Sequence, residues 1–465
     1  MKKDSVLNNR YRVDEGYLNP ANKVLISERT VLSSGANFAY SALFLIAFYY
    51  LAYRYPFQIG DENTSPTYGP TPVVIQVAKY VTLSGTIFLI LNVQSLKFRT
   101  SNLLTPLITI FAVFSLLICI IFAPVNFGAT TRFFEIGFTM IFAILIASAN
   151  SRLAINRKFI KILTIFFWFN VIVYIVQLLL FFLIGRLPAL GYEGGNVRFG
   201  GVWDDPNSAI IPFLLYTVYC MFRDGKTWRN GILLIISLIA LILSQSVTTV
   251  VATIVTAVVI YFWFWRGVPS SAKLMNAAIV SVVSVLGGGI LFLFVSALPV
   301  FDLSSLFESF EKFVEIKEGS AATRGSTYAV LFDLDFLTLL GLDPLMEGGE
   351  NSYVNILVNF GVIFLVVFIA IQALTIRSLY IWTRNAVSKE DYSTAMAFSA
   401  FYIWYVFAML NLPLAEVFPD NLIAAIISGA AIAASGRSVR RLASPRNLDI
   451  HTYARRSGRL AGGNP

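Results

Sequence analysis

The residues best suited to chemistry lie in a glycine-rich segment, residues 191–207, between two long apolar runs. Within it, Arg198 carries a guanidinium that stays charged and offers a planar fork of donors that fits a phosphate. Asp205 and Pro206 are typical of a helix N-cap and first helical residue, so we expect the next helix to begin there and to point free N–H groups at the same place. We therefore predict half of an active site here. The alternative is an ordinary loop with a helix cap.

A second candidate, Arg324, lies in the longest polar insertion, residues 298–350. Apolar residues recur at helical spacing over residues 302–314, which predicts an amphipathic helix on the bilayer or on the helix bundle. A second helical stretch is predicted from about Arg324 to Leu340. An insertion of about 50 residues exceeds what a connection needs, and such insertions usually carry function.

The elements that must position these residues are membrane helices. Hydrophobic residues make up 57% of the 465, charged residues only 13%, and the mean hydropathy is +0.72, which excludes an ordinary soluble globule. The polar N-terminal segment lacks the apolar core of a cleaved signal peptide. Apolar run lengths predict an all-α polytopic membrane protein with about twelve transmembrane helices. These spans lie near residues 35–54, 73–93, 102–123, 134–149, 161–184, 208–222, 231–244, 247–264, 275–297, 351–376, 394–412 and 421–435. Only Ser244, Gln245 and Ser246 separate the seventh span from the eighth, so this pair forms either a hairpin or a broken helix.

The basic residues orient this bundle. Most of the 35 Lys and Arg residues fall in alternate loops and the two ends, which the positive-inside rule assigns to the cytoplasm. Arg198 and Arg324 are among the few on the outer side. The net charge of +9 therefore reflects cytoplasmic anchoring and contact with membrane lipids, and not nucleic-acid binding. The predicted organisation is a cytoplasmic segment 1–34, a bundle 35–297 with an outer loop 185–207, a large outer loop 298–350, spans within 351–435 and a basic cytoplasmic tail 436–465.

Cysteine and histidine chemistry is excluded from the outer side. Cys119 and Cys220 lie inside apolar runs, where a free thiol behaves as a small hydrophobe, so neither a disulfide nor a metal site is indicated. The one histidine, His451, lies in the tail. We expect no metal and no cofactor, and a carboxylate is the remaining candidate for a base.

Short motifs follow one another in a set order between residues 190 and 376. The first, R-x-x-G-x-x-x-x-P-N, comprises Arg198, Gly201, Pro206 and Asn207. The later ones are Arg324 in TRGSTY, Gly341, and an N-S-Y-x-x-x-L-x-x-x-G-x-x-x-F block with Asn351, Ser352, Tyr353, Leu357, Gly361 and Phe364. With the short polar turn at 243–246, this order resembles the O-antigen polymerase and O-antigen ligase superfamily of bacterial inner-membrane glycosyltransferases.

The resemblance implies a GT-C-like architecture with a large periplasmic helical loop and both termini in the cytoplasm. It implies transfer without a metal, with inversion at the anomeric carbon, from undecaprenyl-pyrophosphate-linked oligosaccharides at the periplasmic face. A chain-length regulator and a flippase of the same pathway become candidate partners. Ligases of the superfamily usually carry a histidine before the asparagine of the last motif, and here that position is Glu350. This difference favours a polymerase over a ligase, or else the chain uses a carboxylate in place of the histidine.

Three residues are the catalytic candidates. Charge that develops on a leaving pyrophosphate must be met by fixed cations, so we expect Arg198 and Arg324 to clamp it. Glu350 is the first candidate for the base that activates the acceptor hydroxyl, ahead of Asp205 and Glu347. As alternatives, either arginine forms a salt bridge, Asp205 only caps a helix, and Glu350 caps or pairs with an arginine.

The candidate substrate-binding residues are Asp205, Asn207, Trp203, Asn351, Tyr353 and Lys79. Lys79 lies inside the second predicted span, where charge is costly, and either reaches a phosphate or Glu416 at the outer interface or merely snorkels. Trp203 stacks on a sugar ring or belongs to an interfacial aromatic belt.

Two other classes compete with a glycosyltransferase. A secondary transporter of two halves commonly has its long loop inside and at the centre, whereas here the long insertion is outside and late in the chain. A polysaccharide flippase should carry more polar residues along its spans. Within the superfamily, a ligase that transfers glycan to lipid A core is the alternative to a polymerase.

Overall fold

The computed structural model is helical over nearly all of the chain that it describes. It describes residues 103–122, 127–148, 154–184, 192–193, 196–197, 199–201, 207–224, 228–244, 246–265, 334–340, 351–386, 388–415 and 420–442. A two-residue antiparallel pair, β1 (Tyr192–Glu193) and β2 (Asn196–Val197), lies in the glycine-rich segment. The predicted spans 35–54, 73–93 and 275–297 lie outside the described residues.

Every predicted span that falls on described residues contains a helix. The helices are α3 (Leu104–Phe122), α4 (Phe127–Ser148), α5 (Ala154–Ile184), η3 (Ser208–Ile210), α6 (Ile211–Asp224), α7 (Trp228–Leu243), α8 (Val247–Val259), η4 (Ile260–Phe264), α11 (Phe336–Leu340), α12 (Ser352–Phe360), α13 (Val362–Asn385), α14 (Lys389–Ala408) and α15 (Asp420–Leu442). Four stretches are long and apolar enough to cross a membrane: Leu104–Ile121, Leu163–Leu180, Val247–Phe264 and Val362–Asn385. The chain is therefore a multi-pass membrane protein.

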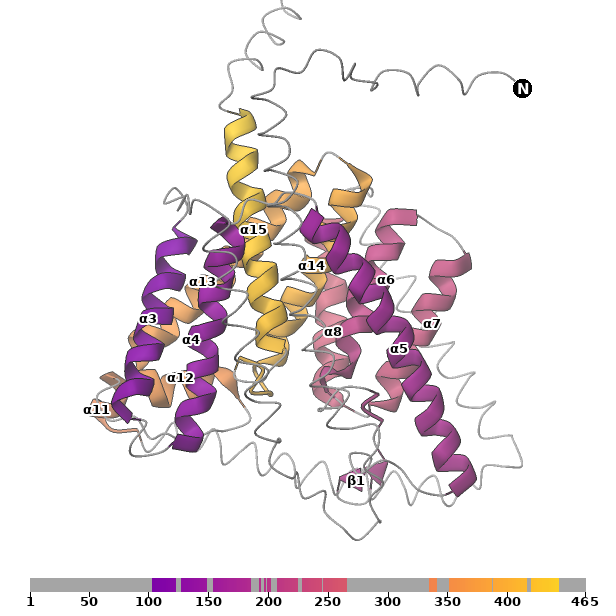
Figure 1. The fold of residues 1–465 in the computed structure, drawn as a ribbon, viewed down its shortest axis with the longest axis horizontal. Coiled ribbons are helices and arrows are strands. Elements are labelled where there is room, and N and C mark those ends of the chain that lie inside the picture. Colours follow the sequence, from indigo (N-terminus) through magenta and orange to yellow (C-terminus); the bar gives the residue numbers. More distant parts are fainter. Residues whose placement is uncertain are drawn as a thin grey trace, which may run out of the picture.

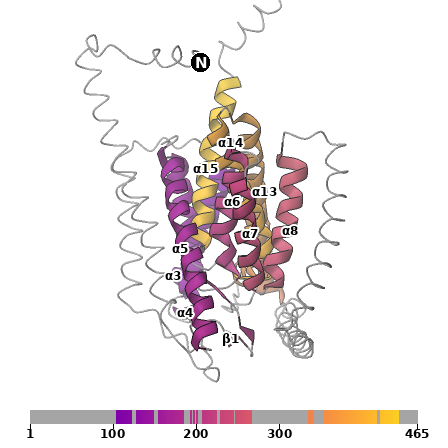
Figure 2. The ribbon, with the colours of Figure 1, turned by 90° about the vertical axis from the view of Figure 1, so that its right-hand side faces the viewer.

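The helices run side by side around two central ones, α14 and α15 (Figures 1 and 2). Helix α14 contacts α6, α8, α13 and α15, and every residue from Ser393 to Tyr405 is buried. Helix α15 contacts α4 and α13 and is rich in alanine between Ala424 and Ala434. Small side chains let helix backbones approach closely inside a membrane, where apolar surface gives little drive to associate. Helix α14 thus contributes aromatic side chains to the core, and α15 contributes small ones.

The turn between α7 and α8 is a hairpin, which settles the alternative between a hairpin and a broken helix. At one end of the pair, Arg229 of α7 forms an ion pair with Asp224, the last residue of α6. Trp265, which directly follows η4, contacts the ring of Phe222 in α6 with 5.5 Å between centroids. The start of α7 and the end of α8–η4 therefore lie together, and Ser246 caps α8 at the opposite edge by accepting a hydrogen bond from the N–H of Thr249.

The predicted span 351–376 is wrong in one respect, because the structure divides it. Gly361 has φ 83° and ψ 173°, a conformation open essentially to glycine alone, and it ends α12 and begins α13. The membrane-crossing stretch is Val362–Asn385, and α12 is a separate nine-residue helix before it. The stretch predicted as helical from Arg324 to Leu340 is described only from Leu334 onward, and there Leu334 and Asp335 are not helical and α11 begins at Phe336. The Thr338 N–H donates to the Asp335 carboxylate (2.6 Å) and thereby lowers the pKa of Asp335.

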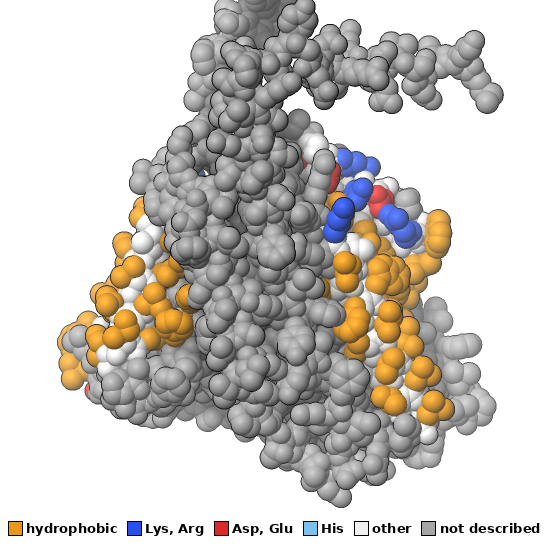
Figure 3. All heavy atoms as spheres, viewed as in Figure 1, with side chains coloured by type: hydrophobic (Ala, Val, Ile, Leu, Met, Phe, Trp, Pro, Cys, Tyr) orange, Lys and Arg blue, Asp and Glu red, His pale blue; other side chains and the backbone are white. Residues whose placement is uncertain are grey.

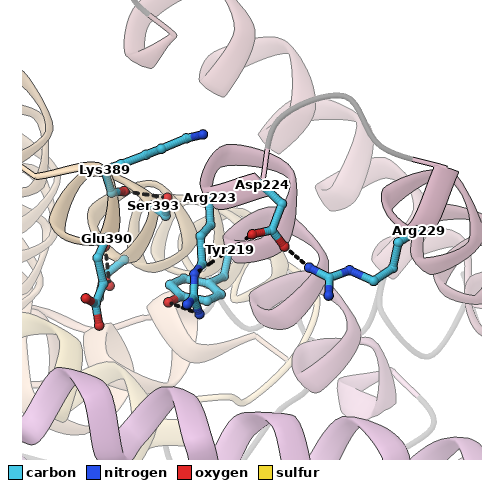
Figure 4. A network of polar contacts seen from close by, with 8 residues as sticks. Tyr219, Arg223, Asp224, Arg229, Lys389, Glu390 and Ser393 are labelled. Carbon is cyan, nitrogen blue, oxygen red and sulfur yellow. Dashed lines mark hydrogen bonds and ion pairs between the residues drawn. The ribbon is translucent and has the colours of Figure 1, made fainter. Parts of the chain in front are cut away.

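Positive charge gathers at one edge of the described bundle, above apolar helix surfaces (Figure 3). Arg223 at the end of α6 and Arg229 at the start of α7 both form ion pairs with Asp224 there, and Lys389 lies nearby at the start of α14 (Figure 4). The guanidinium of Arg223 also donates to the Tyr219 hydroxyl at 3.1 Å. We call this the basic edge. Among the lysines and arginines in the described helices, only Arg132 lies in the half of its helix away from this edge.

Candidate active site

A cluster of buried polar contacts lies at the edge opposite the basic edge. We call it the junction and define it by residues 199–201, 207–208, 351–353, 409–415 and 420–421, together with the α5 side chains that contact them. These residues sit at the start of α6, the start of α12, the end of α14 and the start of α15. Buried polar groups inside a membrane protein must find partners, and they usually mark structural junctions or functional sites.

One face of α5 holds the segment that directly follows Arg198. Asn170, Tyr174 and Gln177 are spaced four and three residues apart, so they lie along one side of the helix, and all three are buried. The Gln177 side-chain amide donates to the Gly201 carbonyl (3.0 Å), and its oxygen accepts from the Gly201 N–H (3.1 Å). The Tyr174 hydroxyl donates to the carbonyl of Phe199 (3.1 Å). Gln177 therefore pairs with this backbone in both directions, as a neighbouring strand would.

Gly201 is required by its conformation and by its surroundings. Its φ is +62°, in the left-handed region. A Cβ at this position would lie 2.1 Å from the Asn170 Oδ1 atom and 2.7 Å from the Tyr174 ring. The segment also bonds to the α7–α8 hairpin, because the N–H of Phe199 donates to the Leu243 carbonyl (3.1 Å). The backbone that follows Arg198 is thus fixed against α5 and α7.

The start of α6 is tied to three other helices. The hydroxyl of Thr249 in α8 donates to the carbonyl of Asn207 (2.9 Å), and the Asn170 amide donates to the carbonyl of Ala209 (3.3 Å). The Ser208 hydroxyl donates to the Asp420 carboxylate, with 2.5 Å between the oxygens, and both side chains are fully buried. Asp420 is the first residue of α15, where the unpaired N–H groups of the first turn favour a negative charge.

The Asn351-Ser352-Tyr353 motif binds the backbone around the end of α14. Asn351 caps α12, because its Oδ1 atom accepts from the N–H groups of Tyr353 and Val354. The same side chain donates to the carbonyl of Leu410 (2.6 Å). The N–H of Ser352 donates to the carbonyl of Met409 (3.1 Å).

Side chains of the same motif add further contacts to this stretch. The Ser352 hydroxyl donates to the Leu412 carbonyl (3.0 Å) and accepts from the Ala415 N–H (3.1 Å). The Tyr353 hydroxyl donates to the carbonyl of Val406 (3.0 Å). All three residues of the motif are therefore held by α14 and the stretch after it.

Two distant motif segments consequently meet at one connection, the stretch from the end of α14 to the start of α15. The segment with Asn207 and Ser208 reaches it through Asp420, and the segment with Asn351 and Ser352 reaches it through residues 409–415. Near the start of α15, the Asn421 side chain donates to the carbonyl of Ala415 (3.4 Å). The junction thus joins the residues that follow Arg198 to those that follow Glu350.

The structure describes three of the predicted site residues. Asn207, Asn351 and Tyr353 all lie in the junction, and the contacts above are made by the backbone of Asn207 and by the side chains of Asn351 and Tyr353. The remaining predicted residues lie outside the described residues: Arg198, Arg324, Glu350, Asp205, Trp203 and Lys79. Arg198 directly precedes Phe199 in sequence, and Glu350 directly precedes Asn351.

Metal-binding groups are sparse in the described part of the chain. There, no cluster of three or more His, Cys, Asp or Glu residues has the geometry to hold a metal ion. Cys119 and Cys220 are buried, and neither is in a disulfide bond.

Sequence reasoning missed Ser208, Asp420 and the α5 side chains. The spacing of Asn170 and Gln177 within an otherwise apolar run was a readable signal, because two amides on one face of a membrane helix need partners. Asp420 also had a signal, since it stands directly before a small, apolar helical run. Its partner, 212 residues away, carried no signal of its own.

Comparison of the chain with protein-family models gives no match, and neither does comparison with curated protein sequences. The class that the fold defines is a multi-pass helical membrane protein with a buried polar junction at one edge.

Proposed function

We propose that this protein is a polysaccharide polymerase of the O-antigen polymerase and ligase superfamily. It joins oligosaccharide repeat units carried on undecaprenyl pyrophosphate, at the periplasmic face of a bacterial inner membrane, to build an O-antigen, capsule or exopolysaccharide. The proposed architecture has about twelve spans, with both termini in the cytoplasm, on the side of the basic edge. The candidate partners are membrane lipids, a flippase and a chain-length regulator.

The observation that carries the proposal is the meeting of two motif segments in the junction. Ser208, ten residues after Arg198, and the residues Asn351 and Ser352 that directly follow Glu350 are far apart in sequence. Both segments nevertheless bond to the connection between α14 and α15. A reaction that needs a cation and a base on the same substrate requires such proximity. The junction also lies opposite the basic edge, which is the side that a periplasmic reaction requires.

The proposed reaction is a single displacement. The acceptor sugar hydroxyl attacks the anomeric carbon of the donor, and the bond from that carbon to the pyrophosphate oxygen breaks. Glu350 takes the proton of the hydroxyl, while Arg198 and Arg324 meet the negative charge that moves onto the departing undecaprenyl pyrophosphate. Trp203, Asp205, Asn207, Asn351, Tyr353 and Lys79 complete the proposed binding surface.

The test uses purified protein in lipid vesicles with a lipid-linked repeat unit, and polymer length is read on a gel. The wild type should extend the substrate, whereas Arg198→Ala, Arg324→Ala and Glu350→Gln should each lower extension by at least about 100-fold. Arg132→Ala is the matched control, because Arg132 is an outer arginine with no assigned role. Full extension by both arginine variants would refute the proposed binding of pyrophosphate by Arg198 and Arg324. Full extension by Glu350→Gln would refute the role of Glu350 as the base.

A ligase is separated from a polymerase by the product that a deletion strain accumulates. Loss of a polymerase leaves single repeat units attached to lipid A core, whereas loss of a ligase leaves unattached polymer. We expect single units.

A secondary transporter is the second candidate, favoured by one observation. Transporter sites are often built on discontinuous helices, and α12 and α13 form such a break at Gly361. Asn355 and Asn359 on α12 are buried beside the break. Uptake of sugar or lipid-linked sugar into sealed vesicles, without any extension of the glycan, would favour the transporter.

A further inference from the structure

The Ser208–Asp420 hydrogen bond joins the start of α6 to the start of α15. The two oxygens lie 2.5 Å apart, both side chains have no exposed surface, and the partners are 212 residues apart in sequence. A buried hydrogen bond to a charged group is among the stronger polar contacts, and the loss of one partner leaves the other buried and unsatisfied. This contact is therefore suited to fixing the position of one segment against another.

Asp420 is held in turn by contacts that lead to the second motif. The next residue, Asn421, donates to the carbonyl of Ala415 (3.4 Å), and the N–H of Ala415 donates to the hydroxyl of Ser352 (3.1 Å). Ser352 is adjacent to Asn351, the cap of α12. A short path of buried contacts thus runs from Ser208 to the segment that follows Glu350.

We propose that Ser208 and Asp420 are positioning residues, which set the distance between the segment after Arg198 and the segment after Glu350. This inference rests on the proposed function, in which Arg198 and Glu350, which precede those two segments, are the cation and the base. Reacting groups must be held within about 0.5 Å of productive geometry, and a misplacement of about 1 Å costs about 100-fold in rate. Neither residue donates or accepts a proton in the reaction.

The first test separates positioning from catalysis by kinetics. Ser208→Ala and Asp420→Ala should lower kcat by about 10- to 100-fold, with KM for the lipid-linked donor within about threefold of the wild-type value. Asp420→Asn should stay within about threefold of the wild-type kcat, because its amide oxygen still accepts from Ser208. Ser399→Ala is the matched control, since Ser399 is equally buried but donates only to Ala395 in its own helix. We expect wild-type kinetics from it.

The second test measures the link itself by hydrogen–deuterium exchange and does not depend on activity. Ser208→Ala should raise exchange at the start of α6 and also in residues 351–355, whereas Ser399→Ala should change neither. An increase confined to the start of α6 would overturn the proposal. A kcat of Asp420→Asn as low as that of Asp420→Ala, with an altered pH profile, would also overturn it, because the carboxylate would then act by its own titration.

Failure of the proposed polymerase activity and failure of the positioning role give different results. If wild-type protein extends no lipid-linked glycan while Ser208→Ala still loosens residues 351–355, the proposed polymerase activity fails and the positioning link stands. If the wild type extends glycan and Ser208→Ala and Asp420→Ala match it in kcat, the activity stands and the positioning role fails.

Discussion

Replacement of Gly201 by alanine should displace the backbone that follows Arg198. A left-handed conformation costs a residue with a side chain about 1–2 kcal/mol. The added Cβ would also lie 2.1 Å from the Oδ1 atom of Asn170, which is far below contact distance. Asn170 must then move and lose the bond that it donates to Ala209, which leaves a buried polar group unsatisfied at about 1–3 kcal/mol. The sum is a destabilisation of about 2–5 kcal/mol, centred on the contact between α5 and the start of α6.

The assay compares denaturant unfolding of Gly201→Ala and Gly231→Ala in the same detergent. Gly231 is a matched control, because it lies in α7 and a Cβ there meets no atom within 4 Å. Its replacement should be neutral or stabilising by up to about 1 kcal/mol, since alanine is the better helix former. Glycan extension should fall with Gly201→Ala and remain unchanged with Gly231→Ala.

A double variant tests the mechanism behind this loss. Gly201→Ala combined with Asn170→Ala removes the closest clash, so its destabilisation should be smaller than the sum of the single effects by about 1–3 kcal/mol. The reasoning is refuted if Gly201→Ala unfolds at the same denaturant concentration as wild type, or if the two substitutions simply add.

Three further perturbations probe the same regions. Gly361→Ala should destabilise the protein by about 1–3 kcal/mol, because the φ of 83° suits only glycine, and denaturant unfolding against Gly231→Ala measures it. Asn351→Ala should cost about 1–3 kcal/mol through loss of the α12 cap and of the bond to Leu410, whereas Asn351→Asp keeps the cap and should cost less in the same assay. The hydrogen bond from the Thr338 N–H to the Asp335 carboxylate stabilises the start of α11. Its stabilisation is fully present above the pKa that Asp335 has in the unfolded chain, and it is lost as the pH falls through the lower pKa of Asp335 in the folded protein. Amide exchange of residues 336–340, corrected for the intrinsic rate, should therefore rise at low pH in the wild type, and Asp335→Asn should show no such step.

The helical bundle could be predicted because bilayer thickness fixes the length of an apolar run. Such runs marked the position of each described span, and the sequence also indicated the hairpin between α7 and α8 as one of two alternatives. The break at Gly361 could not be predicted. A single glycine inside an apolar helical pattern is compatible with a continuous helix, and its positive φ shows only in the fold.

The junction was predictable only in part. Asn207 and Asn351 could be selected because they border polar segments next to spans. The contact of Asn207 with Thr249 of α8 and that of Asn351 with the stretch after α14 depend on helix packing. Ser208 and Asp420 could not be paired, because nothing local links residues 212 positions apart. Gly201 could be named from its motif, while the reason for glycine there lies in the approach of Asn170.

The enclosure of α14 has a consequence for biosynthesis. This helix carries Lys389, Glu390 and Asp391 in its first turn and is not among the described helices that meet the length and hydropathy required of a candidate span. Its partners α6, α8 and α13 precede it in the chain. We expect α14 to insert into the membrane efficiently during synthesis only when those earlier helices are already inserted and can pack against it. A fusion reporter placed after residue 408 should therefore lose its fixed orientation when α6 is deleted.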